Sequence, residues 1–271
     1  MDNNTFALAF TPVELTLVAG SLDVPSLPLP EESFSDWLPE EIDEALQQAR
    51  ESLAARRYIQ TQPNGTIAVD TAVAALVGAL AFRDSSLVIT RLVEQGSGRT
   101  RHIYFASGLI VEQEQEQDGK YRLTAVRDRE VLTRRLVEFL HLTDQPAPRA
   151  QPCTLAEDEI SEARRRVEEE GEKACIGFLE SVGVESPTAA SLARALAHPV
   201  SQSALLALAW EGEEAQRLGG FTLLEGIDGL WLFQSQEHDD RPRLEIIPCN
   251  ASGAVQQIGS LARLAIPEVE E

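Results

Sequence analysis

The sequence has few of the residue patterns that carry chemistry. Its three cysteines, Cys153, Cys175 and Cys249, lie far apart and form no C-x-x-C pair, which argues against a disulfide framework or a zinc knuckle. Its four histidines are scattered, with no pair at metal-ligand spacing. No phosphate-binding glycine loop, dinucleotide fingerprint or serine-nucleophile elbow is present. We therefore predict that the protein is not an enzyme and has no catalytic residue, no cofactor and no metal, although a Cys–His pair assembled by the fold stays open.

The densest group of metal-ligand residue types is Glu237, His238, Asp239 and Asp240. An aligned segment in the first half of the chain, residues 116–119, reads EQDG and has the composition of a plain hairpin tip. We therefore interpret residues 237–240 as a hairpin loop.

Long hydrophobic runs and positive charge are also lacking. No apolar run approaches the roughly 18 residues that span a bilayer, and Asp2 stands where a signal peptide would carry Lys or Arg. The net charge is −21, and both halves of the chain are acidic. Such a charge repels phosphate backbones and anionic lipids. We therefore expect a cytoplasmic protein without nucleic-acid or membrane partners, suited to a partner with a basic or apolar surface.

The chain contains an internal repeat. Residues 107–126 and 228–247, aligned without a gap at an offset of 121, share eight of twenty residues. Upstream, residues 70–85 and 186–201 share six of sixteen at an offset of 116. Each copy predicts an alanine-rich helix capped by Asp70 or Ser186, a meander of strands and a closing helix.

This repeat predicts an α+β protein with two α/β units related by a pseudo-twofold axis, each with antiparallel sheet and helices. We place the first unit at residues 1–142, a proline-rich linker at 143–153 and the second unit at 154–271.

Four residues are candidates for binding another protein. Thr154 and Glu157 predict a capping box for one long helix over 154–183, in which Ile160 and Val167 belong to a narrow apolar stripe suited to a helical contact. Trp231 and Phe233 share one face of a strand, with Leu230 and Leu232 on the other. For this aromatic pair, core packing and an aromatic contact surface are the two alternatives.

The N-terminal segment has a winged-helix-like pattern. ESLAARRYIQTQPNGTIAVD, residues 51–70, is typical of the passage from the third helix of such a domain into its wing. That helix begins with Glu40, Glu41, Asp43 and Glu44 at the end that would approach base edges. These acids favour a structural or protein-binding role, and the alternative is a transcriptional regulator whose α/β part binds a ligand or dimerises.

One local cluster is basic, against the charge of the rest of the chain. It contains Lys120, Arg122, Arg127, Arg129, Arg134 and Arg135. Its two alternatives are a solvated strand end and helix face, or a patch for an acidic partner or anionic ligand.

The layout as a whole resembles the EspG family, the secretion-associated cytosolic proteins of ESX (type VII) systems. The resemblance rests on ESLAARRYIQTQPNGTIAVD, on the following helix DTAVAALVGALA, on the strand meander and on a second similar unit after a linker. It implies a mixed fold with a central sheet and helical bundles, and a non-catalytic adaptor or chaperone that binds a helical secreted client of PE–PPE type and keeps it soluble. It carries no motif that assigns binding residues, and leaves open whether the protein is a monomer or a homodimer.

Overall fold

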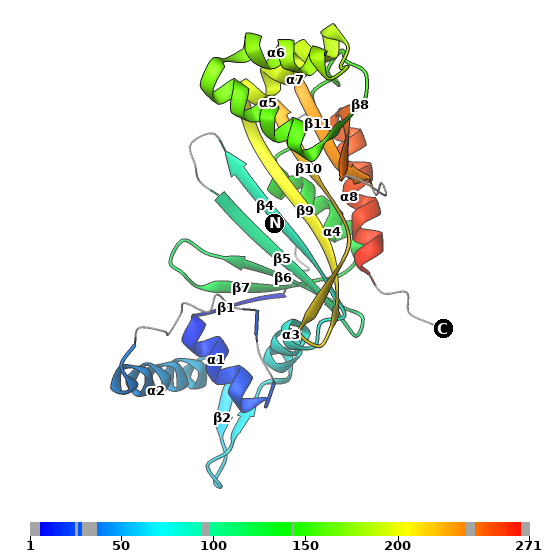
Figure 1. The fold of residues 1–271 in the computed structure, drawn as a ribbon. Helices are drawn as coiled ribbons and strands as arrows, with labels where there is room; N and C mark the ends of the chain where they lie inside the picture. The colour runs from blue at the N-terminus through cyan, green and yellow to red at the C-terminus, as the bar shows by residue number, and fades with distance from the viewer. Residues whose placement is uncertain are drawn as a thin grey trace.

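The computed structural model describes residues 6–24, 27–28, 37–93, 98–142, 144–236 and 242–266. A ten-stranded antiparallel sheet runs through the molecule in the order β1-β7-β6-β5-β4-β9-β10-β11-β12-β8 (Figure 1). A small hairpin, β2–β3, projects from one end. The mixed α+β fold expected from the sequence is therefore confirmed.

The first half of the chain supplies five of the strands of the large sheet, the hairpin and four helices. These are β1 (Phe6–Phe10), α1 (Pro12–Ser21), α2 (Pro39–Ala55), β2 (Ile59–Thr61), β3 (Ile67–Val69), α3 (Thr71–Ala81), β4 (Ser85–Val93), β5 (Gly98–Ala106), β6 (Leu109–Gln115), β7 (Tyr121–Val126) and α4 (Arg129–Leu140).

The second half supplies the other five strands and four helices. These are β8 (Cys153–Ala156), α5 (Glu157–Glu170), α6 (Glu172–Ser181), α7 (Ser186–Ala197), β9 (Pro199–Glu211), β10 (Glu214–Gly226), β11 (Gly229–Gln236), β12 (Arg243–Cys249) and α8 (Ala251–Ala265).

The two units share one sheet, where the sequence suggested a separate sheet in each. The join is the antiparallel ladder between β4 and β9, which runs from Ser85–Ala209 to Val93–Ser201. The paired centres of the two strands, residues 87–89 and 205–207, are apolar on both faces, so each strand gains more by pairing than by exposing an edge. The pseudo-twofold arrangement is preserved within this continuous sheet.

The repeated helices bury equivalent positions. Val73, Leu76, Val77 and Ala79 of α3 are buried, and so are the residues 116 positions later in α7, Ala189, Leu192, Ala193 and Ala195. The closing helices α4 and α8 correspond at a spacing of 122 positions, and each is capped at its N-terminus by an equivalent side chain, Asp128 or Asn250. The first strand and helix of each unit, β1–α1 and β8–α5, also agree in how the helix begins. Glu14 accepts a hydrogen bond from the Thr11 backbone amide, and Glu159 accepts one from the Ala156 backbone amide.

The repeated hairpins match as elements but not residue by residue. The ungapped alignment pairs Val111 with Leu232, yet Val111 packs against α1 and α3 while Leu232 packs under α4 and α8. The turns explain the difference: one loop is Ser107–Gly108 and the other is residues 227–228, one position earlier in the alignment. A shift of one residue turns every side chain of a strand to the opposite face.

The core lies in three clusters on the two faces of the sheet. We call the face covered by α1, α3 and α5–α7 the front face, and the face covered by α4 and α8 the back face. On the front face, one cluster lies under α1 and α3 and another under α5, α6 and α7. The back face holds a single cluster that spans both units.

The long helix expected over 154–183 is interrupted. Thr154 lies in β8, and α5 and α6 are separated by Gly171, whose φ of 88° and ψ of 175° lie in a region open almost only to glycine. The expected capping box of Thr154 and Glu157 is therefore wrong, since Glu159 caps α5. The break lets both helices pack against α7, which a straight helix would not do.

The winged-helix-like segment consists of α1, α2 and the β2–β3 hairpin. Glu40, Glu41, Asp43 and Glu44 at the start of α2 are all exposed. At the other end, Arg56 donates to the Ala9 carbonyl at 2.7 Å and pairs with the buried carboxylate of Glu14. This arginine therefore fastens α2 to α1 and β1.

Candidate protein-binding site

The centre of the front face carries no helix. Helix α3 packs against β5, β6 and β7, and α7 packs against β10, while β4 and β9 cross the space between the two groups of helices (Figure 1). Along both strands most back-face residues are buried and most front-face residues are half-buried or exposed. We call these front-face positions, Val88, Thr90, Leu92, Val200, Gln202, Ala204, Leu206 and Leu208, the central surface.

The central surface is uncharged and mostly apolar, with Thr90 and Gln202 as its polar members. Across the ladder Val88 lies opposite Leu206, and Thr90 lies opposite Ala204. At the end nearer α7, Leu92 and Val200 are 47% and 42% exposed. None of the eight residues carries a charge, in a chain whose net charge is −21. An uncharged apolar strip on an acidic protein is typical of a contact surface for another molecule.

The rim on β5 is also uncharged. The His102 ring stacks on Tyr104 with a centroid distance of 6.2 Å, and the Tyr104 hydroxyl donates to Gln113 at 2.8 Å. Burial lowers the pKa of His102, so the imidazole is neutral near pH 7. A cavity of about 270 Å³ has Thr100 and His102 in its lining together with the charged Arg99 and Glu114.

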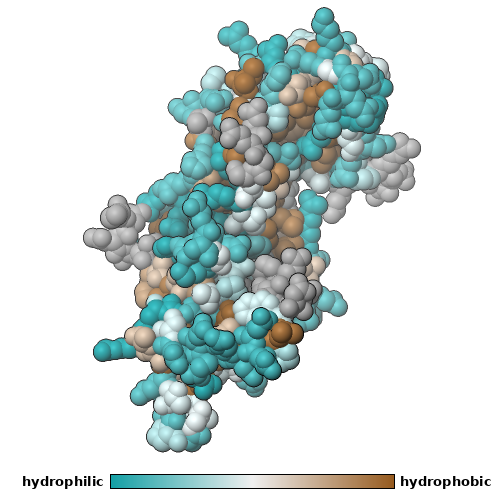
Figure 2. All heavy atoms as spheres, turned by 90° about the vertical axis from the view of Figure 1, so that its left-hand side faces the viewer, coloured by the Kyte–Doolittle hydropathy of each residue, from teal (hydrophilic) through white to brown (hydrophobic). Residues whose placement is uncertain are grey.

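The end nearer α3 is closed by an aromatic side chain. The indole nitrogen of Trp210 donates to the Ser86 hydroxyl at 2.9 Å, and the Arg83 guanidinium lies 3.8 Å from the centre of the ring. Figure 2 views the molecule from the open side, and the apolar residues on this side are most evident in its upper part, towards the α5–α7 end.

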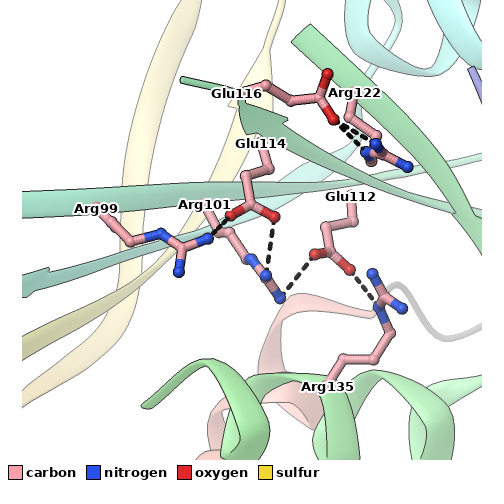
Figure 3. Close-up of polar contacts among 7 residues, drawn as sticks. All are labelled: Arg99, Arg101, Glu112, Glu114, Glu116, Arg122 and Arg135. Carbon is pink, nitrogen blue, oxygen red and sulfur yellow. Dashed lines mark hydrogen bonds and ion pairs between the residues drawn. The ribbon is translucent and has the colours of Figure 1, made fainter. Parts of the chain in front are cut away.

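The back face of β5 and β6 carries an ion network instead of an open surface (Figure 3). Glu112 pairs with Arg101 at 2.8 Å and with Arg135 of α4 at 2.5 Å, and Glu114 bridges Arg101 and Arg99. The Arg101 guanidinium also lies 4.5 Å from the centre of the Phe139 ring. These contacts fix α4 to the sheet.

The basic cluster expected at residues 120–135 is largely neutralised. Lys120, Arg122, Arg127 and Arg135 pair with Asp118, Glu116, Asp128 and Glu112 respectively. Four of its six cations thus have a carboxylate beside them, which favours the solvated strand end and helix face over an anion-binding patch.

The structure buries most of the four residues expected to contact a partner. Trp231, Phe233 and Ile160 lie in the core beneath α5, α6 and α7, and Val167 is half-buried beside them. The predicted faces are correct, since Leu230 and Leu232 lie in the back-face core. Trp231, Phe233 and Ile160 are 1%, 4% and 5% exposed, which favours core packing over a contact surface for them.

The cysteines and acids form no assembled site in the part of the chain that the structure describes. Burial raises the pKa of Cys153, Cys175 and Cys249 to about 11, so all three are thiols at neutral pH. Among the described residues no three His, Cys, Asp or Glu side chains are placed to hold a metal ion. Residues 237–240 lie outside the described residues. No helix in the described ranges is long and apolar enough to cross a membrane.

The central surface was missed by reasoning from the sequence, although β9 carries a signal for it. Residues 204–210, ALLALAW, are apolar at consecutive positions and therefore on both faces of the strand. Such a run is typical of a strand covered on both faces. In this structure only the back face is covered within the chain.

The comparisons with known proteins follow this geometry. The model of the EspG family matches residues 11–259. A solved structure of the Mycobacterium tuberculosis type VII secretion system chaperone EspG5, in complex with the PE25–PPE41 dimer, is 16% identical, with 98% of this chain and 99% of that chain covered and a TM-score of 0.71. At that identity the likeness shows a shared fold.

Two further comparisons add no relative. A putative adenylate cyclase from Bacillus halodurans aligns at 9% identity over 70% of this chain and 80% of its own, with a TM-score of 0.11. No curated protein matches the chain. The family model covers most of the sequence, from α1 into α8, and the EspG5 structure has the same fold. The chain belongs to the EspG family.

Proposed function

We propose that the protein is a non-catalytic cytosolic chaperone that binds a helical secreted client of PE–PPE type through the central surface. The observation that carries the proposal is the uncharged, uncovered front face of β4 and β9 between two groups of helices. Membership of the EspG family supports a secretion-related client, and the EspG5 structure was solved with a PE25–PPE41 dimer bound.

The width of the surface suits a helix. Strands β5, β4, β9 and β10 are adjacent, and three spacings of about 4.8 Å give a width of roughly 14 Å. An α-helix with its side chains is about 10–12 Å across. One helix, or the tip of a helical pair, would therefore fill the space between α3 and α7.

Shielding is the proposed mechanism. Apolar side chains of the client would leave water on contact with Val88, Leu206 and their neighbours, at roughly 25 cal/mol per Å² of apolar surface. The negative charge over the rest of the molecule would keep the complex soluble. The pseudo-twofold within one chain already supplies two related halves, so we propose that a single chain holds one client.

Co-expression with a PE–PPE pair from the same genome tests the proposal. The readouts are co-purification on a tag and the mass of the complex by size-exclusion chromatography with light scattering. Leu92→Glu places a charge on the central surface at an exposed position, and we expect it to abolish co-purification. Leu264→Glu, at a 59% exposed position of α8 beyond the back face, is the matched control and should leave it intact. Equal recovery with both variants would show that the client binds elsewhere.

A further inference from the structure

The space under the C-terminal half of α8 differs from the equivalent space under α4. The two spaces can be compared because the ladders agree: Arg101 lies opposite Glu114 in the first unit, and 120 positions later Phe221 lies opposite Gln234. The helices agree as well, since buried Phe139 of α4 corresponds to buried Leu261 of α8 at a spacing of 122.

In the first unit this space is filled by charged side chains. Arg99 and Arg101 extend over the Phe139 ring and pair with Glu114, and Arg101 also pairs with Glu112 (Figure 3). Arg135 reaches Glu112 from the helix. The side chains of the protein itself thus occupy the gap between helix and sheet.

In the second unit the positions equivalent to these charged residues hold uncharged ones. Gly219 stands at the position of Arg99, Phe221 at that of Arg101, Leu232 at that of Glu112, Gln234 at that of Glu114 and Gln257 at that of Arg135. These changes leave a groove of about 420 Å³, the α8 groove, whose lining includes Gly219, Gln234, Gln257, Ser260 and Leu261. Its volume is within the roughly 300–1,000 Å³ of small-ligand sites.

Two exposed leucines flank the α8 groove. Leu218 is 41% exposed and Leu264 is 59% exposed, and Leu264 lies over Gly219, where an added Cβ would be 3.4 Å from its Cδ1 atom. Arg217 is the single charged residue in the lining, against the −21 of the whole chain. A cationic group placed here would meet Arg217 and no carboxylate of the lining, and an anionic group would approach against the negative charge of the whole chain, whereas an uncharged apolar group meets neither cost.

We propose that the α8 groove docks an uncharged peptide segment of a second protein, which inserts one bulky apolar side chain between Leu218 and Leu264. The amide groups of Gln234 and Gln257 and the Ser260 hydroxyl supply donors and acceptors for the backbone of that segment. The groove lies on the back face and the central surface on the front face, so both are accessible at once. This site does not depend on the proposed client and adds a second partner to it.

Selection from a phage-displayed library of random short peptides on the full-length protein tests the proposal. Counter-selection uses the double variant Leu218→Glu/Leu264→Glu, whose exposed positions tolerate charge, and thermal unfolding checks its fold. We expect enriched peptides that are uncharged and carry a Leu, Phe, Trp or Met anchor. In fluorescence anisotropy each should bind the double variant at least about tenfold more weakly than the wild type. Gln257→Arg, which restores the first unit's residue, should weaken binding as well because the guanidinium would enter the groove.

Leu92→Glu on the central surface is the matched control and should bind these peptides like the wild type. The proposal is overturned if no enriched peptide distinguishes the wild type from the double variant, whatever small molecules bind there. It is also overturned if the peptides are lost with Leu92→Glu instead, since that result would place them on the front face. Failure of PE–PPE co-purification with the wild type would affect the proposed function alone.

Discussion

Ile89 of β4 lies directly opposite Leu205 of β9 in the middle of the ten-stranded sheet, and both side chains are buried in the back-face core. The two residues are 116 positions apart, the spacing that also relates α3 to α7. A residue that pairs with its own counterpart marks the point where the pseudo-twofold axis crosses the sheet. The two units are therefore joined through equivalent strands, as the subunits of an isologous dimer are.

This join predicts a single unfolding transition. Leu205→Ala should lower the free energy of unfolding by about 2–5 kcal/mol, because it leaves a cavity beneath both α4 and α8. Urea unfolding followed by tryptophan fluorescence and by far-ultraviolet circular dichroism should give coincident curves for the wild type and the variant. Two separate transitions would mean that the units are independent despite the shared ladder.

The buried carboxylate of Glu112 is predicted to matter far more than the half-exposed carboxylate of Glu116. Glu112→Gln leaves Arg101 and Arg135 without their shared anion, and we expect a loss of about 3 kcal/mol or more. Glu116→Gln removes an ion pair with Arg122 that is open to solvent, and should cost less than about 1 kcal/mol. Urea midpoints of the two variants check this difference, and equal losses would contradict it.

The break between α5 and α6 predicts opposite effects for two glycines. Gly171→Ala should destabilise the protein by about 1–3 kcal/mol, because alanine is strained at a φ of 88° and a ψ of 175°. Gly177→Ala, within α6 and with no neighbour within 4 Å of an added Cβ, should stabilise it by about 0.5–1 kcal/mol. Chemical denaturation measures both, and a neutral Gly171→Ala would show that the two helices tolerate a continuous path.

His102 predicts a loss of stability in mild acid. Burial lowers its pKa, so below the ordinary value of about 6.5 the unfolded chain binds a proton that the folded protein binds less well. The free energy of unfolding should therefore rise with pH up to about pH 6.5, and the contribution of His102 is complete above that value. His102→Gln should reduce the slope of the urea midpoint against pH. An unchanged slope in His102→Gln would assign the effect to other groups.

Trp231 and Leu92 are predicted to separate stability from binding. Trp231→Ala should cost about 3–5 kcal/mol of stability because the indole is buried under α5–α7. Any variant protein that stays folded should retain the proposed PE–PPE client, since Trp231 is only 1% exposed. Leu92→Glu should do the reverse and lose the client with little change in the unfolding midpoint. Loss of the client in folded Trp231→Ala would restore the aromatic residue to the binding site.

Local patterns in the sequence determined the elements of this protein. Asp70, Asp128 and Asn250 cap the helices that follow them, and alternation along residues 230–233 separates the front-face core from the back-face core. The repeat, the antiparallel meanders and the overall order of elements also follow from the sequence. Each of these depends on residues a few positions apart, where capping hydrogen bonds and hydrophobic periodicity act directly.

Only the tertiary structure decided how the elements meet. The pairing of β4 with β9 joins residues more than one hundred positions apart, and the periodicity of a strand does not name its partner. The same contact determines which face stays open, so the central surface appears only once both units are in place. The α8 groove lies within the second unit and depends on how α8 packs on β10 and β11. Gly171, one residue in a helical pattern, turned a single expected helix into two, because a glycine in an extended left-handed conformation ends the run of helical hydrogen bonds.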